Sequence, residues 1–368
     1  MSQETKNTDK EEGALKGVDS LLELNRRHSE EFMSASEESA RRLYRAIHPT
    51  EVSAFKCMDG RIHLPFMTET PLGIISPWRN VGGQFNVGWP LFNSELREWR
   101  DYAISRGRHG LCLVTYHFSA GDTHRGCKGF EYDVDESKRF TADLVGQFNR
   151  LLGQSAFYTV HVGVETDEDA LILHGEHGGV FRVVDVLDRS ESSLAKVLAD
   201  LYPSMADQIR RDFLPLIMGN IRHVKQVKAS HRPVTEIEHK ESILAFGRGF
   251  DWLHVANKAL IVGPFDPNYA DVVAKAGGII LDNLKAGQIQ ADEIVLLISS
   301  PFRDAGSERR FMLEKARYLQ EAALASLSSR PELQELMPHL QILTGVVNMH
   351  DRRLEILNKG RWQPTSNS

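Results

Sequence analysis

The chain has 368 residues, of which 41% are hydrophobic and 26% charged; this is ordinary for a globular protein and is enough for two domains or one large fold. Its 50 acidic residues exceed its 44 lysines and arginines, so no electrostatic footprint of nucleic-acid binding is visible and we expect no nucleic-acid partner. Three cysteines are too few for a disulfide-stabilised secreted scaffold, and apolar runs such as residues 294–298 are too short to span a bilayer. We therefore expect a cytoplasmic chain without a membrane partner.

The hydropathy pattern of the first half predicts a tail followed by alternating strands and helices. Residues 1–18 are polar and charged, which predicts a disordered tail, and helical spacing of apolar residues predicts a helical region over residues 19–48. Alternation of strands and helices is typical of an α/β sheet, whose ligands gather beyond the carboxyl ends of the strands. The expected strands are 52–55, 72–75, 111–116, 158–164 and 170–173. The expected helices are 95–105 and 135–152, followed by helical segments over residues 193–227.

The second half repeats several features of the first half. In order along the chain, residues 245–248 match 54–57, residues 307–311 match 136–140, and residues 344–354 match 162–172. On this alignment Ser299 falls near the counterpart of His117, and the second half contains no cysteine. The sequence therefore predicts a duplicated fold, with a metal-binding catalytic domain over residues 49–230 and a pseudo-repeat domain over residues 231–368.

Cys57, His117 and Cys127 are the candidate metal ligands. Cys57 follows the first expected strand, His117 closes the third, and Cys127 lies in the polar segment after it. Two thiolates and one imidazole match a catalytic zinc site with an open fourth position, so we expect Zn²⁺ as the cofactor. His124 is an alternative third ligand, but we favour His117 because it lies at a strand end. Cys112 lies inside an apolar run and is expected to be a buried thiol.

Asp59 and Arg61 are the candidate catalytic pair. They flank Gly60, which permits a tight backbone path, so the carboxylate and the guanidinium can turn to the same side. Asp59 can then accept the hydrogen of a zinc-bound hydroxide, and Arg61 can hold Asp59 off the metal through a bidentate ion pair. An alternative interpretation is an ion pair in an ordinary strand-exit turn.

These motifs resemble the ordered motifs of β-class carbonic anhydrases. The resemblance rests on Cys57, Asp59 and Arg61 at alternate positions, on residues 79–83 (Arg-Asn-Val-Gly-Gly), and on a strand-end histidine with a later cysteine. Residues 116–127 are also similar to the carboxysome shell branch, in which the strand-end histidine is the ligand and the second half has lost its zinc. The resemblance implies a β-carbonic-anhydrase-like sheet with a zinc half and a zinc-less half.

The resemblance also implies a reaction and partners. Hydroxide activated by zinc would attack carbon dioxide to give bicarbonate, and whole chains would associate as homo-oligomers. Gly82, Gly83 and Phe118 are expected to form a small, dry substrate pocket, and His63, His124 or a buffer would carry the proton away. Shell enzymes carry a large N-terminal helical domain where this chain has a short tail, so we expect the cytoplasm rather than the carboxysome.

Two alternative functions fit the same residues. A zinc hydrolase of the same fold would act on carbon disulfide or carbonyl sulfide. A non-catalytic, zinc-stabilised binding module would use both His117 and His124 as ligands and leave no exchangeable water on the metal.

Overall fold

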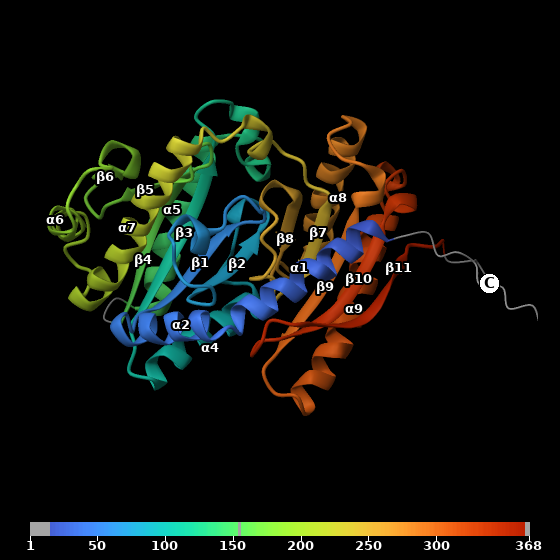
Figure 1. The fold of residues 1–368 in the computed structure, drawn as a ribbon, viewed down its shortest axis with the longest axis horizontal. Helices are drawn as coiled ribbons and strands as arrows, with labels where there is room; N and C mark the ends of the chain where they lie inside the picture. Colours follow the sequence, from blue (N-terminus) through green and yellow to red (C-terminus); the bar gives the residue numbers. More distant parts are fainter. Residues whose placement is uncertain (1–14, 154–155, 365–368) are drawn as a thin grey trace, which may run out of the picture.

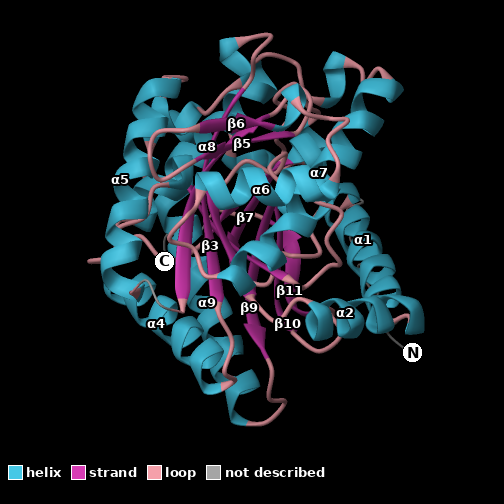
Figure 2. Ribbon diagram, turned by 90° about the vertical axis from the view of Figure 1, so that its left-hand side faces the viewer, coloured by secondary structure: helices cyan, strands magenta, loops and turns pink. Residues whose placement is uncertain are grey.

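The computed structural model describes residues 15–153 and 156–364, which form two β-sheets covered by helices (Figures 1 and 2). In the first sheet the strands lie in the order β2-β1-β3-β4-β5-β6, and in the second in the order β11-β10-β9-β7-β8. The first sheet consists of β1 (Glu51–Cys57), β2 (Ile75–Asn80), β3 (Gly110–Phe118), β4 (Phe157–Glu165), β5 (Ala170–His174) and β6 (Val180–Arg182). The second consists of β7 (Ile243–Gly247), β8 (Ala259–Val262), β9 (Val295–Phe302), β10 (Gln341–Asn348) and β11 (Leu354–Arg361).

The helices surround these sheets and confirm the α/β class predicted from the sequence. They are α1 (Lys16–Phe32), α2 (Ala35–Ile47), α3 (Leu64–Met67), α4 (Pro90–Ser105), α5 (Val134–Leu152), α6 (Glu191–Leu201), α7 (Asp207–Ser230), α8 (Tyr269–Lys285) and α9 (Ser307–Ser328). Residues 1–14 of the expected disordered tail lie outside the described residues, and α1 begins within the remainder of that segment.

Five strands of the first sheet share their topology with the second sheet, and β6 extends the first sheet alone. In the first sheet β1 pairs in parallel with β2 and β3, β3 pairs in parallel with β4, and β5 is antiparallel to β4. Strands β7, β8, β9, β10 and β11 repeat this pattern of neighbours and directions. The chain is therefore a duplicated α/β fold, as expected.

The strand registers align the two halves residue by residue. Phe55 lies opposite Val114 in the first sheet, and Phe246 lies opposite Ile298 in the second. Extending both registers by two residues places Arg248 at the position that Cys57 occupies in the first half. The counterpart of His117 is then Pro301, and Ser299 aligns with Thr115, two residues before the expected position.

The first sheet is covered on both faces, which explains its nearly continuous apolar strands. On one face, α4 and α5 contribute to an aromatic cluster in which the ring of Phe55 contacts Trp78, Phe92 and Phe148. On the other face, α7 buries residues such as Ile217 against Leu113 and its neighbours. Both layers hold the carboxyl ends of β1 and β3 in fixed positions.

The two halves are joined by backbone hydrogen bonds beside the carboxyl end of β1. Ile261 N–H donates to the carbonyl of Met58 at 2.7 Å, and Gly60 N–H donates to the carbonyl of Ala259 at 2.9 Å. Figure 1 shows α1 and α2 running across the edges of both sheets, with α1 beside the second sheet. The segment just after Cys57 thus lies at the junction of the two halves.

Two expected elements differ from the structure. The strand expected at residues 72–75 is a turn in which Gly73 has a φ of 84° and Ile74 N–H bonds to the carbonyl of Pro71, so β2 begins only at Ile75. The helical region at 19–48 is divided because Ser34 caps a second helix. The helical segments expected over residues 193–227 are α6 and α7, which are separated around Pro203.

Buried His161, paired with the half-buried His174 in the first sheet, should make the folded state less stable in acid. His161 Nε2 lies 2.8 Å from Thr141 Oγ1, and its ring stacks on His174 at 4.5 Å. Burial and the nearby His174 lower the pKa of His161 to about 3, from 6.5. A histidine with a lower pKa in the folded state contributes stability that is present above its unfolded pKa and is lost as pH falls, because the unfolded chain takes up the proton first.

We expect His161 alone to make the free energy of unfolding about 2 kcal/mol smaller at pH 5 than at pH 8. Urea denaturation at both pH values measures this difference. In a His161→Gln variant, which can still contact Thr141, the difference should shrink. An unchanged pH dependence in that variant would contradict the assignment.

Candidate metal centre

Cys57, His117 and Cys127 meet at the carboxyl end of the first sheet. Cys57 ends β1, His117 lies near the end of the neighbouring β3, and Cys127 comes from the loop beyond β3. Their ligand atoms all lie within 4.8 Å of one another, and the two sulfur atoms are 3.8 Å apart. Each of the three residues is at most 4% exposed. The sequence prediction thus named three residues that the fold brings together.

The unsatisfied atoms of this group fit a metal ion. Both ring nitrogens of His117 are buried and have no hydrogen-bond partner among the described residues. A buried polar atom without a partner is costly, and a metal–nitrogen bond would remove that cost. Two sulfurs and one imidazole nitrogen are the donor set that zinc prefers, and three protein ligands leave its fourth position open.

The two thiols are electrostatically different. With Cys127 as donor, the hydrogen bond between them lowers the pKa of Cys57 well below its ordinary value; burial opposes this change and His117 supports it. The same hydrogen bond, together with burial, raises the pKa of Cys127. Cys57 is therefore the sulfur that ionises first, and a divalent cation would displace the remaining proton from Cys127.

Asp59 and Arg61 form a buried ion pair next to this group. Arg61 Nη2 donates to Asp59 Oδ2 at 2.6 Å and Nε donates to both carboxylate oxygens at 3.1 Å, while the backbone N–H of Arg61 donates to Oδ1 at 2.9 Å. Asp59 Oδ2 lies 3.9 Å from His117 Nδ1. Although burial alone would raise the pKa of Asp59, the charge and hydrogen bonds of Arg61 lower it well below its ordinary value. Asp59 is therefore a carboxylate at neutral pH.

Two further cations fix the loop that carries this ion pair. The fully buried Lys56 donates from Nζ to the carbonyl of Ile62 at 2.8 Å. Arg79 donates to the carbonyls of Asp59 at 2.8 Å and Ile62 at 3.0 Å. The loop between Cys57 and Ile62 thus directs several carbonyls toward buried cations, which holds its shape.

Glycines allow the loop of Cys127 to approach β1. Gly82 and Gly83 have φ values of 60° and 67°, a region that favours glycine. A Cβ on Gly83 would lie 3.3 Å from the backbone of Lys56, and one on Gly129 would lie only 2.5 Å from the nitrogen of Gly82. Both expected pocket glycines therefore lie beside the candidate metal centre, where they allow close backbone packing.

The other expected site residues lie in different surroundings. The side chain of His124 is 81% exposed and contacts Asp122, outside the group of three. His63 is buried; its ring packs on His254 at 4.3 Å, and burial lowers its pKa well below its ordinary value. The ring of Phe118 stacks on Tyr116, and side chains two apart in a strand share a face, so Phe118 lies on the face opposite to His117.

Sequence reasoning missed two residues that the second half contributes. His239 Nε2 lies 3.2 Å from Arg61 Nη2, and His239 Nδ1 lies 2.7 Å from the buried carboxylate of Glu241. Asp59, His239 and Glu241 also have ligand atoms within 4.8 Å of one another. Both carboxylate oxygens of Asp59 already accept hydrogen bonds from Arg61. We therefore interpret this second group as a hydrogen-bonded network rather than a metal site. The sequence contained one signal for them: a histidine and a glutamate, His239 and Glu241, lie two residues apart just before a strand.

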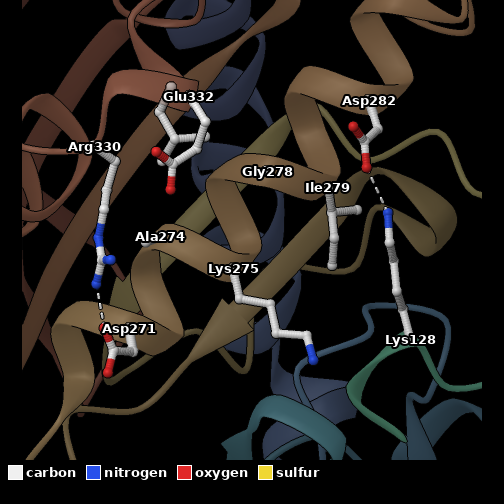
Figure 3. A pocket seen from close by; sticks show the side chains of 10 residues that line it. Lys128, Asp271, Ala274, Lys275, Gly278, Ile279, Asp282, Arg330 and Glu332 are labelled. Carbon is white, nitrogen blue, oxygen red and sulfur yellow. Dashed lines mark hydrogen bonds and ion pairs between the residues drawn. The ribbon is translucent and has the colours of Figure 1, made fainter. Parts of the chain in front are cut away.

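A groove of about 360 Å³ lies beside the loop of Cys127, between Lys128 and helix α8 (Figure 3). Lys128 pairs with Asp282 at 2.8 Å and Lys275 pairs with Glu131 at 3.1 Å, so two exposed ion pairs connect this loop to the second half. Exposed pairs contribute little stability, so this contact can open at small cost.

Comparison with known proteins finds a distant similarity to a carbonic anhydrase. The carboxysome shell carbonic anhydrase of Halothiobacillus neapolitanus is 24% identical to the chain over 291 residues. The chain thus resembles a carbonic anhydrase at a distance. The match covers 65% of this chain and 55% of that protein, so the chain spans about half the length of its relative. No protein-family model matches the chain.

Within residues 15–153 and 156–364, no helix is long and apolar enough to cross a membrane.

Proposed function

We propose that this protein is a zinc carbonic anhydrase that interconverts carbon dioxide and bicarbonate. The observation that carries the proposal is the buried Cys57, His117 and Cys127 group with the Asp59 carboxylate 3.9 Å from His117. The distant similarity to a carbonic anhydrase points to the same reaction.

Cys57, His117 and Cys127 would hold the zinc ion and leave its fourth position open. Zinc bound there would lower the pKa of a coordinated water to about 7 and so supply hydroxide for attack on carbon dioxide at neutral pH. Asp59 would accept a hydrogen bond from the attacking group and so orient it. Because Arg61 holds both carboxylate oxygens, Asp59 does not turn toward the metal ligands.

The surroundings of these residues suit a small, uncharged substrate. Cys57, His117, Cys127 and Asp59 are each at most 4% exposed, so the reacting atoms would be shielded from bulk water. Gly83 lies close to the backbone of Lys56 and Cys57, beside the group, and we retain it and the adjacent Gly82 as the pocket wall. Phe118 faces away, so we do not include its ring in this pocket.

Metal analysis and stopped-flow hydration of carbon dioxide test the proposal on the whole chain. We expect stoichiometric zinc, and hydration that disappears when a chelator removes the zinc and returns when zinc is added back. A parallel assay for sulfide release from carbon disulfide and carbonyl sulfide distinguishes the related hydrolase. Bound zinc without hydration would point to a binding module instead.

We further propose that the chain acts in the cytoplasm as a homo-oligomer. The relative is named for the carboxysome shell, which makes the carboxysome the alternative location. Sedimentation of the purified protein and fractionation of its source cells test the two statements separately.

A further inference from the structure

The segment that leads into the second half reaches the catalytic pair of the first half. Arg61 Nη1 donates to the carbonyl of Ile237 at 2.7 Å, and Arg61 Nη2 lies 3.2 Å from His239 Nε2. His239 is held in turn by Glu241, whose oxygen Oε1 lies 2.7 Å from Nδ1. These residues are 176 to 180 positions away from Arg61 in the sequence, so the fold, rather than a local motif, makes the contact.

The contacts determine the tautomer of His239. A guanidinium has only donors, so His239 Nε2 can join this contact only as an acceptor, which requires that it carries no proton. The two hydrogens of Nη2 also point to the nearer oxygens of Asp59 and Arg125, so Nε2 shares one of them. The ring proton is then on Nδ1, where it is donated to the Glu241 carboxylate. A histidine held in one tautomer by a carboxylate is a rigid acceptor, because neither its orientation nor its proton position is free to change.

Glu241 is itself fixed by the second half. It is 0% exposed, and its oxygen Oε2 accepts a hydrogen bond from Asn283 Nδ2 at 3.0 Å. The same amide nitrogen of Asn283, in α8, lies 3.1 Å from the backbone carbonyl of Glu241. A buried carboxylate needs such partners, and here both of its oxygens have one.

The guanidinium of Arg61 therefore connects three separate segments. Nη2, which donates to Asp59, also faces the carbonyl of Arg125 and the imidazole of His239. Nη1 donates to the carbonyl of Ile237. Arg125 belongs to the loop between His117 and Cys127. Without His239, Nη2 would lose one of its three acceptors, and Asp59, which is bound to the same nitrogen, would be held less precisely.

We propose that the Glu241–His239 pair of the second half positions the Asp59–Arg61 pair of the first half. The second half has no cysteine, but it supplies the hydrogen-bond acceptor that completes the site. The catalytic consequence of this inference rests on the proposed carbonic anhydrase function, whereas its structural basis does not. His239 and Glu241 act here as positioning residues that do not touch the reacting atoms.

Kinetics of four variants test this role. His239→Leu removes the acceptor and should lower kcat about 10–100-fold, with zinc content and KM unchanged, as is usual for groups that orient others. His239→Gln can place its amide oxygen near the position of Nε2, so it should restore most of kcat. Glu241→Gln should give an intermediate loss. The exposed His177, changed to Gln, is the matched control and should behave like the wild type.

The tautomer provides a readout that does not depend on activity. A long-range ¹H–¹⁵N spectrum of histidine-labelled, metal-free protein should show His239 protonated at Nδ1 and unprotonated at Nε2. The opposite tautomer, or a folded His239→Leu variant that hydrates carbon dioxide at the wild-type rate, would overturn the proposal. If the wild-type protein binds zinc but does not hydrate carbon dioxide, the proposed function fails, and the tautomer still decides whether the contact exists.

Discussion

Replacing Cys57 by serine is expected to remove zinc and carbon dioxide hydration together. The hydrogen bond with Cys127 and the nearby His117 lower the pKa of Cys57 well below its ordinary value. A serine hydroxyl keeps the shape but does not ionise at neutral pH, so the site would lose its most readily available anionic ligand. Metal analysis should give a zinc content near zero, and hydration should fall to the rate of the buffer.

Cys112→Ser is the matched control for this experiment, since it makes the same chemical change in a buried cysteine outside the donor group. Cys112 is 0% exposed, and burial raises the pKa of its thiol, so the thiol stays protonated at neutral pH. This variant should keep zinc and activity and lose some stability, because a hydroxyl replaces an apolar thiol in the sheet. Parent-level hydration by the Cys57→Ser variant would place the site elsewhere.

Asp59→Asn is expected to separate metal binding from turnover. Asparagine keeps the size of the side chain, and Cys57, His117 and Cys127 remain, so zinc should stay bound. The amide presents an N–H group where the carboxylate offered only acceptors, so the hydroxide would lose its fixed orientation. We expect kcat to fall about 100-fold, by analogy with groups that orient metal ligands.

The free energy of unfolding of the Asp59→Asn variant must be measured together with kcat, because this substitution leaves Arg61 buried without its counter-charge. Removing one member of a buried ion pair costs about 3–5 kcal/mol of unfolding free energy. A double variant, Asp59→Asn with Arg61→Met, removes the second charge and should recover most of that stability without recovering turnover. If the double variant regains turnover, the loss in the single variant is an effect on folding rather than on catalysis.

The part of the site that lies within a few residues could be predicted from the sequence. Cys57, Asp59 and Arg61 are adjacent along one loop, and His117 ends the strand beside it, so strand order alone brings them together. The choice between His117 and His124 also followed from the strand end, because His124 lies in an exposed turn.

The contribution of the second half could not be predicted in this way. His239 reaches Arg61 only because β8 pairs with the loop after β1, and nothing in the local pattern around His239 specifies that contact. The break between α1 and α2, by contrast, had a visible signal. Ser34 followed three residues later by Glu37 is a common start of a helix, and Glu37 N–H does donate to Ser34 Oγ. Apolar residues at helical spacing both before and after Ser34 made the two helices look like one helical region.

The pairing of both sheets within one polypeptide has a consequence for assays in dilute solution. Where a site is built across two separate subunits, dilution separates its parts and the specific activity declines. Here the link between Arg61 and His239 is intramolecular, so the effective concentration of one half around the other does not depend on how much protein is present. Specific activity should therefore stay constant down to nanomolar protein, whatever larger assemblies the chains form.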